Sequence, residues 1–332
     1  MHSFSIAMEL FGILHPLVVL AVLGLSDLQH IPFRKGNKLI AGAMDTINLL
    51  RTVSKKIFFV TNNSTKSRKG CLDKFTSLGL RVHEEGIITT HSLGVFLSIR
   101  RLKVILTNCD YFRLCSRLEI FSSSFAAAAY LEQNPMPQGK KVYVIGQQGI
   151  CEELDLLGIP HIGGPADAHH KVDFAHNHKI HHDKDVGAVV VGLDTNINYY
   201  KIQYAQLCLN ENEGCLFIAT NLDAVAHLTD QQKWAGGGAM VGAIKGCTGK
   251  EPILVGKPSP LLIDYITEKH RIDRSRICMV GDRLDTDIVF GLNNGLQTVL
   301  TLSGVTTEQQ VLSADNKVVP DYYIPSIANL LK

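Results

Sequence analysis

The stretch ICMVGDRLDTDI at residues 277–288 joins a short apolar run to a cluster of carboxylates. The apolar residues 277–280 end at a glycine, which is typical of a strand buried on both faces of a parallel sheet. Asp282, Asp285 and Asp287 follow within six residues, and such oxygen ligands suit a hard cation. A charged loop that caps a helix is the alternative. The density of carboxylates beside a glycine favours a metal site.

The same alternation extends outward from this stretch. Short apolar runs that end at turn or polar residues occupy residues 56–60, 141–145, 186–191, 215–219, 253–255 and 298–302. Helical patterns separate them, for example at 67–78, 125–133 and 260–270. This rhythm predicts a doubly wound α/β fold with a parallel sheet. In such folds ligands bind at the carboxyl ends of the strands.

Two further polar segments lie at predicted strand ends. Thr61, Asn62 and Asn63 follow one apolar run, and a hydroxyl with exposed backbone N–H groups can hold phosphoryl oxygens. Turn residues are the alternative, because Thr and Asn are common at strand ends. Lys257 follows another run and offers a fixed positive charge to a phosphoryl group, unless it is an ordinary solvated lysine.

Composition sets the class of protein. A chain of 332 residues has room for two domains or for one core with a large insertion. Its 45% hydrophobic and 19% charged residues indicate a globular protein rather than a disordered one. A net charge of +2 gives no reason to expect nucleic acid or a membrane surface as a partner. The eight cysteines include no CxxC pair, which is typical of a reduced, intracellular chain.

Three biased segments have competing interpretations. The apolar residues 8–25 fit a signal-peptide core, a membrane span or a buried strand. Six histidines lie between residues 167 and 183, and their spacing favours a polar loop over a metal site. The glycine-rich residues 235–242 follow no apolar strand, so they do not predict dinucleotide binding.

Taken in order, three motifs resemble those of a known family. TNNSTKSR at 61–68, VGKPS at 255–259 and GDRLDTDI at 281–288 resemble motifs two, three and four of the haloacid dehalogenase phosphatases. The resemblance is greatest to the branch of phosphoglycolate and 4-nitrophenyl phosphatases, which includes pyridoxal phosphatases. FSSSFAAAAYL at 121–131 and VGAVVVGLD at 186–194 are similar to the plant phosphoglycolate enzymes.

The resemblance implies a Rossmann-like doubly wound core with an inserted α/β cap domain. The expected division is an atypical N-terminal segment 1–32, a first core part 33–163 with an atypical insertion 86–118, a cap 164–250 and a second core part 251–332. Relatives pair through their caps, so a homodimer is implied. Plant members are chloroplast or cytosolic enzymes, and either compartment fits this chain.

The resemblance also assigns roles to residues. Catalytic roles fall to Lys257 and Asp287, and Lys257 also binds the phosphoryl group. Thr61, Asn62 and Asn63 are the further substrate-binding residues, a small phosphorylated metabolite is the partner, and the cofactor is Mg²⁺ with Asp282 as a ligand. The 221–223 turn resembles a TNRD specificity loop, in which Leu222 replaces the arginine.

The first family motif, DCDGV, is absent. With one inserted residue, Asp27 falls where a nucleophilic aspartate forms an aspartyl-phosphate, and Gln29 falls at the position of the acid/base aspartate. Chance placement of Asp27 is the favoured alternative to a nucleophilic role. Glutamine cannot donate and retrieve a proton at neutral pH, so we expect little or no turnover. We interpret segments 1–32 and 86–118 as products of a wrong first exon and a retained intron.

Three functions remain open from the sequence. The first is hydrolysis of 2-phosphoglycolate through an aspartyl-phosphate and Mg²⁺. The second is binding of phosphorylated metabolites without turnover. The third is hydrolysis of another small phosphomonoester, such as pyridoxal phosphate.

Overall fold

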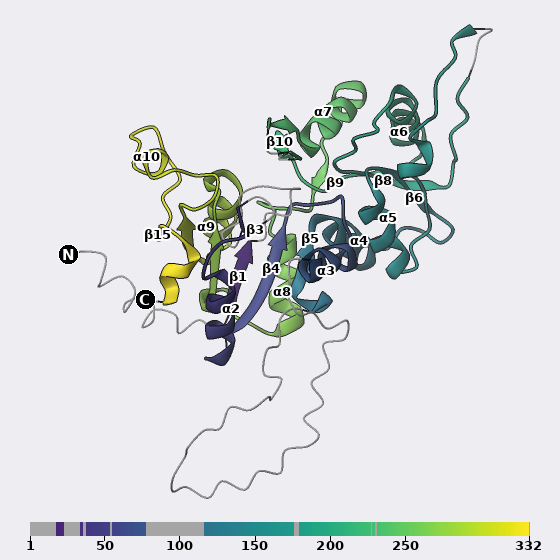
Figure 1. Ribbon diagram of the computed structural model, residues 1–332. Coiled ribbons are helices and arrows are strands. Elements are labelled where there is room, and N and C mark those ends of the chain that lie inside the picture. Colours follow the sequence, from purple (N-terminus) through teal and green to yellow (C-terminus); the bar gives the residue numbers. More distant parts are fainter. Residues whose placement is uncertain are drawn as a thin grey trace, which may run out of the picture.

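Two parallel sheets form the protein, as the computed structural model shows (Figure 1). The structure describes residues 18–22, 34–35, 38–53, 55–77, 116–175, 179–226, 228–229 and 231–331. The first sheet has the order β15 (Tyr322–Ile324), β14 (Gln297–Thr301), β13 (Ile277–Gly281), β1 (Val18–Val22), β4 (Lys56–Thr61), β5 (Ile120–Ser122). The second has the order β12 (Ile253–Leu254), β9 (Leu216–Ala219), β8 (Val186–Val191), β6 (Lys141–Ile145), β7 (His161–Gly163). The predicted α/β fold with a doubly wound parallel sheet is therefore confirmed.

The first sheet is wound in both directions from β1. Along the chain, β4 and β5 are added on one side of β1, whereas β13, β14 and β15 are added on the other. All neighbouring pairs are parallel. The carboxyl ends of β4, β1 and β13 therefore lie next to one another at one edge, which is where doubly wound sheets bind ligands.

Strand β1 lies within the segment 1–32 that the sequence marks as atypical. Val18–Val22 pairs with β13 on one side and with β4 on the other. Of the three interpretations of residues 8–25, the structure supports a strand for these five residues. Asp27, Gln29 and nearly all of segment 86–118 lie outside the described residues.

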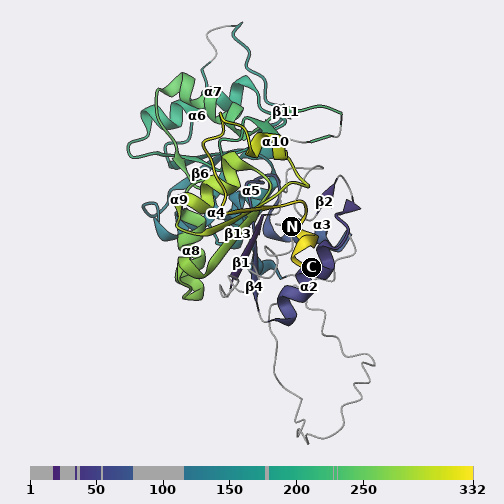
Figure 2. The same cartoon turned by 90° about the vertical axis from the view of Figure 1, so that its left-hand side faces the viewer.

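Helices cover both faces of the first sheet (Figure 2). Helices α2 (Ala43–Thr52) and α3 (Arg68–Ser77) pack on one face with the 3₁₀ turn Ile327–Leu331. Helices α8 (Leu261–His270) and α9 (Val289–Asn293) pack on the other. The predicted helices at 67–78 and 260–270 are confirmed within one residue at each end.

We call the second sheet and its helices the cap. Its helices are α5 (Gln148–Leu156), α6 (Tyr199–Glu211) and α7 (Gly237–Thr248). Three strands of this sheet, β6, β7 and β12, lie outside the range 164–250 expected for the cap, whose limits stay a prediction. Short elements complete the chain: hairpin β2 (Arg34–Lys35) with β3 (Lys38–Leu39), hairpin β10 (Val225–Ala226) with β11 (Trp234–Ala235), and α10 (Glu308–Val311).

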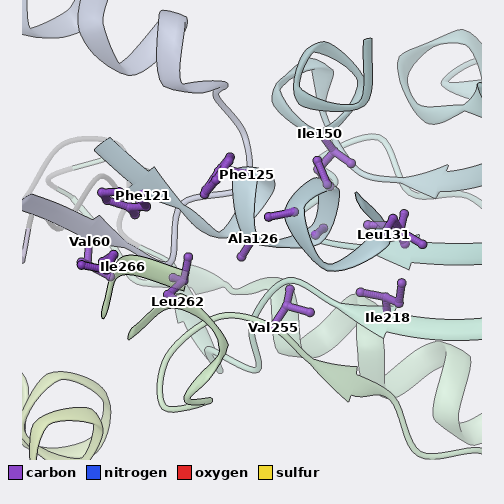
Figure 3. Close-up of a cluster of buried hydrophobic side chains, with 14 of the residues drawn as sticks. Val60, Phe121, Phe125, Ala126, Leu131, Ile150, Ile218, Val255, Leu262 and Ile266 are labelled. Carbon is purple, nitrogen blue, oxygen red and sulfur yellow. The ribbon is translucent and has the colours of Figure 1, made fainter. Parts of the chain in front are cut away.

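Helix α4 (Ser123–Gln133) joins the two sheets. Its alanines, Ala126 to Ala129, are fully buried. They belong to one hydrophobic cluster that also holds Val60 of β4, Ile218 of β9 and Leu262 of α8 (Figure 3). The core and the cap therefore share a continuous apolar interior. Among the described residues, no helix is long and apolar enough to cross a membrane.

Candidate active site

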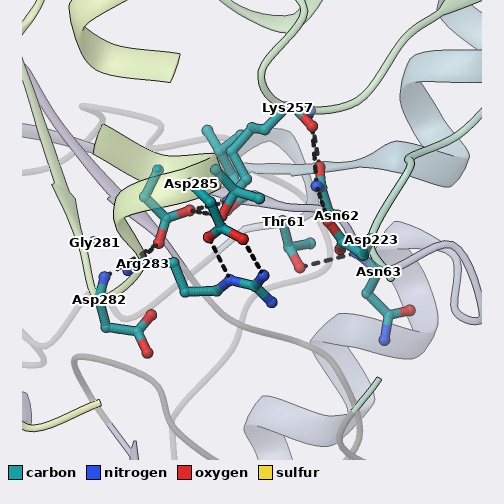
Figure 4. Close-up of polar contacts among 12 residues, drawn as sticks. Thr61, Asn62, Asn63, Asp223, Lys257, Gly281, Asp282, Arg283 and Asp285 are labelled. Carbon is teal, nitrogen blue, oxygen red and sulfur yellow. Dashed lines mark hydrogen bonds and ion pairs between the residues drawn. The ribbon is translucent and has the colours of Figure 1, made fainter. Parts of the chain in front are cut away.

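Lys257 and Asp287 form a buried ion pair at the carboxyl edge of the first sheet (Figure 4). The ammonium Nζ lies 2.8 Å from Oδ1 of Asp287, and also 3.4 Å from the carbonyl oxygen of Val60, where β4 ends. Oδ2 of Asp287 accepts the backbone N–H groups of Asp282 and Arg283, both at 3.1 Å. The structure thus brings the predicted residues Lys257, Asp287 and Asp282 to one place beside Thr61.

The three predicted carboxylates of this segment point to different partners. Asp287 faces Lys257, whereas Asp285 turns outward, is 67% exposed, and forms a bidentate pair with Arg283. The hydrogen bonds that Arg283 donates to Asp285 raise the pKa of the Arg283 guanidinium. Asp285 and Asp287 both lie in the π-helical turn Leu284–Ile288, and their side chains leave it in different directions. Such turns are frequent at functional sites. The three carboxylates are therefore not one shared metal cluster.

Asp282 is the carboxylate that fits a metal. Its Oδ2 accepts the N–H of Val305 at 2.9 Å, and its Oδ1 has no hydrogen-bond partner among the described residues. Burial raises the pKa of Asp282 to about 7, and the charge of Asp287 acts in the same direction. A neighbouring cation would favour the charged form. Mg²⁺ commonly uses one or two protein carboxylates together with waters, so Asp282 suits one of its ligand positions.

The described part of the chain does not place a cluster of metal-binding side chains around Asp282. In that part, no group of three or more His, Cys, Asp or Glu side chains could hold a metal ion. In the histidine-rich segment, His170 lies 3.1 Å from Asp167, and His182 lies 3.0 Å from Asn212.

The loop after β4 is built by side chains that bond to the backbone. Oγ1 of Thr61 accepts the N–H of Asn63 at 3.1 Å. Oδ1 of Asn63 accepts the N–H groups of Thr65 and Lys66 at 2.9 and 3.1 Å. This arrangement turns the chain from β4 towards α3 and keeps Thr61 and Asn63 buried at the strand end. The N–H groups of Asn63, Thr65 and Lys66 are therefore donated within the loop and fix its shape.

The amide of Asn62 is hydrogen-bonded to the backbone of Lys257 and to the cap residue Asp223. Its Oδ1 accepts the N–H of Lys257 at 2.8 Å. Its Nδ2 donates to the carbonyl of Lys257 at 3.1 Å and to Oδ1 of Asp223 at 3.2 Å. The side chain thus connects two core loops and the cap. A direct contact between Asn62 and a substrate stays a prediction.

Asp223 lies in the 221–223 turn that resembles a specificity loop, but no role was assigned to the residue itself from the sequence. It lies on the turn after β9 of the cap, and burial raises its pKa. Its neighbour Leu222 is 48% exposed. The signal was the same as for Thr61 and Asp282: a polar side chain just after an apolar run. Only its neighbours in space, Asn62 and Arg283, show that this strand end meets the site.

Comparisons with known proteins agree with this geometry. The model of the haloacid dehalogenase-like hydrolase family matches residues 9–106, and a HAD-hydrolase-like model matches residues 254–330. Chloroplastic phosphoglycolate phosphatase 1A of Arabidopsis thaliana is 51% identical over 297 residues, which cover 90% of this chain and 73% of that protein. The 4-nitrophenylphosphatase of Schizosaccharomyces pombe is 35% identical over 298 residues, which cover 89% of this chain and 88% of that protein.

A solved structure shows the same fold. A glycerol phosphate phosphatase from Mycobacterium tuberculosis, determined in complex with magnesium, aligns with a TM-score of 0.68. The alignment covers 96% of this chain and 77% of that chain at 22% identity. The sequence identity to the plant and yeast enzymes and the match to the family model show which family this is. The chain belongs to the haloacid dehalogenase-like phosphatases, in the branch of phosphoglycolate and 4-nitrophenyl phosphatases.

Proposed function

We propose that the chain acts on small phosphomonoesters with Mg²⁺ as cofactor, and that 2-phosphoglycolate is its substrate. The buried pair of Lys257 and Asp287 beside Thr61 and Asp282 supports a phosphoryl site at this edge. The 51% identity to a phosphoglycolate phosphatase supports the choice of substrate. Pyridoxal phosphate and glycerol 3-phosphate are the alternatives within the same branch.

Each described residue has a part in this proposal. Lys257 offers its ammonium to the phosphoryl oxygens, and the hydroxyl of Thr61 binds the same oxygens. Asp287 holds the ammonium in place through its 2.8 Å contact. Asp282 is a ligand of Mg²⁺, which supplies positive charge that lets an anionic nucleophile approach an anionic ester.

The covalent step falls to Asp27. A carboxylate oxygen of Asp27 attacks phosphorus, the bond between phosphorus and the ester oxygen breaks, and the leaving oxygen takes its proton from water. Water then cleaves the acyl phosphate and releases inorganic phosphate. Gln29 stands where the proton donor is expected and has no acidic proton. This one residue favours a second candidate, a protein that binds phosphorylated metabolites without turnover.

Phosphate release with Mg²⁺ separates the two candidates. The substrates are 2-phosphoglycolate, glycerol 3-phosphate, pyridoxal phosphate and 4-nitrophenyl phosphate. The chain as it stands should turn over slowly, whereas Gln29→Asp should raise the rate about 10²-fold or more because it restores a general acid. Adding Asp27→Asn to that variant should abolish the reaction.

Each outcome has a consequence. Preference for 2-phosphoglycolate in the Gln29→Asp variant supports the proposed substrate. Binding of phosphate without release in both variants supports the second candidate. Hydrolysis that survives Asp27→Asn would show that the nucleophile lies elsewhere.

The proposal extends to the oligomeric state and the compartment, which we take from the phosphoglycolate phosphatase branch. The chain forms a homodimer through its cap, and it works in the chloroplast or the cytosol. Light scattering during size-exclusion chromatography should give twice the mass of 36.5 kDa. A monomer at micromolar concentration would contradict the dimer.

A further inference from the structure

Asn62 links the backbone of Lys257 to the cap. Its amide group meets the backbone of Lys257 twice, with Oδ1 accepting the N–H at 2.8 Å and Nδ2 donating to the carbonyl at 3.1 Å. Nδ2 also donates its second hydrogen to Oδ1 of Asp223, at 3.2 Å. An asparagine amide has two N–H donors, so both are engaged. The orientation of this amide therefore depends on Asp223.

The turn that carries Asp223 is itself held from two sides. On the core side, Asn221 donates from Nδ2 to the carbonyl of Asn62 at 2.8 Å and accepts the N–H of Asp223 at 3.1 Å. On the cap side, the N–H of Gly238 donates to the carbonyl of Asp223 at 3.0 Å. A Cβ on Gly236 would lie 2.1 Å from that same carbonyl oxygen.

This close approach accounts for Gly236, Gly237 and Gly238 in the glycine-rich residues 235–242. Glycines at the start of α7 let the helix backbone pack directly against the turn, which side chains would prevent. A Cβ on Gly237 would lie 2.9 Å from Oδ1 of Asn221. The glycines thus place a fixed acceptor, Asp223, opposite Asn62.

We propose that Asp223 is a positioning residue: by orienting the amide of Asn62 it fixes the backbone of Lys257, so that the seated cap turn completes the phosphoryl site. The inference rests on the proposed function in one respect, that Lys257 binds the phosphoryl group. Asp223 acts through its hydrogen-bond acceptor Oδ1 and not through its charge. Asparagine keeps this acceptor, and alanine removes it.

Hydrogen–deuterium exchange of the segment that contains Lys257 tests the link without any ligand. The N–H of Lys257 donates to Asn62, so its protection reports on that bond. Asp223→Ala should speed exchange of this amide by about tenfold, the size expected for one weakened hydrogen bond. Asp223→Asn should leave it within about twofold of the original chain. Equal exchange in all three proteins would overturn the proposal.

Calorimetric titration with vanadate in the presence of Mg²⁺ tests the consequence for the site. Asp223→Ala should weaken vanadate binding about tenfold, whereas Asp223→Asn should bind vanadate as the original chain does. In an Asn62→Ala background, Asp223→Ala should have no further effect, because the link is already absent. Additive losses would mean that Asp223 contacts the ligand itself and would overturn the positioning role.

Glu152→Ala is the matched control. Glu152 of α5 accepts a hydrogen bond from Ser67 of the core, so this variant also removes one contact between cap and core, but neither residue is hydrogen-bonded to Asn62, Asp223 or Lys257. It should leave both readouts unchanged. An original chain that fails to bind vanadate while showing the exchange pattern above would refute the proposed function alone. Changed exchange at Lys257 in Glu152→Ala would refute the link through Asp223.

Discussion

The ammonium of Lys257 lies 2.8 Å from the carboxylate of Asp287, with the two side chains 3% and 2% exposed. The chain separates these residues by thirty positions, and they reach the same edge of the sheet from different loops. Asp287 also accepts the N–H groups of Asp282 and Arg283. One carboxylate therefore fixes both the lysine and the loop that holds the metal ligand.

Asp287→Ala should lower the free energy of unfolding by about 3–5 kcal/mol, because it leaves the buried ammonium of Lys257 without its counter-ion. Asp285→Asn is the control, since Asp285 lies two residues away but is largely exposed. Its loss should cost about 1 kcal/mol or less. Urea denaturation of the two variants measures both values. Equal costs would show that burial of the pair with Lys257 is unimportant.

Mg²⁺ should stabilise the folded chain through Asp282. At a concentration of about one hundred times the dissociation constant, the gain is about 2.7 kcal/mol. Asp282→Asn should remove this gain, and should stabilise the metal-free protein because a neutral amide replaces the buried carboxylate of Asp282. Thermal unfolding with MgCl₂ and with EDTA measures both effects. A full magnesium response in Asp282→Asn would exclude Asp282 as a ligand, while Asp285→Asn should keep that response.

Glu153→Ala should loosen the joint between cap and core. Glu153 of α5 is fully buried and pairs with Arg68 of α3 at 2.9 Å, while the guanidinium of Arg68 lies 4.0 Å from the ring centre of Phe125. The loss should cost about 3–5 kcal/mol, since Arg68 stays buried without a counter-ion. Glu152→Ala, which removes one partly exposed acceptor, should cost about 1 kcal/mol. Similar costs in chemical denaturation would argue against a buried joint at Glu153.

Two glycines should respond to alanine in opposite directions. A Cβ on Gly256 would lie 2.1 Å from the carbonyl oxygen of Thr220 and 2.9 Å from Oδ1 of Asn62. Gly256→Ala should therefore destabilise the chain by about 1–3 kcal/mol and weaken vanadate binding. Gly242, exposed on α7 with nothing near its Cβ position, should gain about 0.5–1 kcal/mol as alanine. Denaturation curves measure the free energy of unfolding of both variants. A stabilised Gly256→Ala variant would show that the loop of Gly256 can move away from Thr220 and Asn62 at no cost.

Several features of the fold could be predicted from local pattern. Apolar runs that end at turn residues located β4, β6, β8, β9, β12, β13 and β14 within one residue at each end. The short strands β5, β7 and β15 lack a long apolar run, and no prediction covered them. For residues 8–25 the composition left a strand, a span and a signal peptide open. The pairing of β1 with two neighbours supports the strand.

The sequence by itself determined the α/β class, the strand ends at which the chemistry lies, and the family, because alternating apolar runs and short polar motifs are local properties of a chain. Only the tertiary structure decided which strands share a sheet, since parallel pairing joins segments that are distant in sequence. It also decided what each carboxylate and amide does. Asp285 faces solvent, Asp287 faces Lys257, and Asn62 bonds to Lys257 and Asp223, because contacts between separate loops depend on how the two sheets pack around α4.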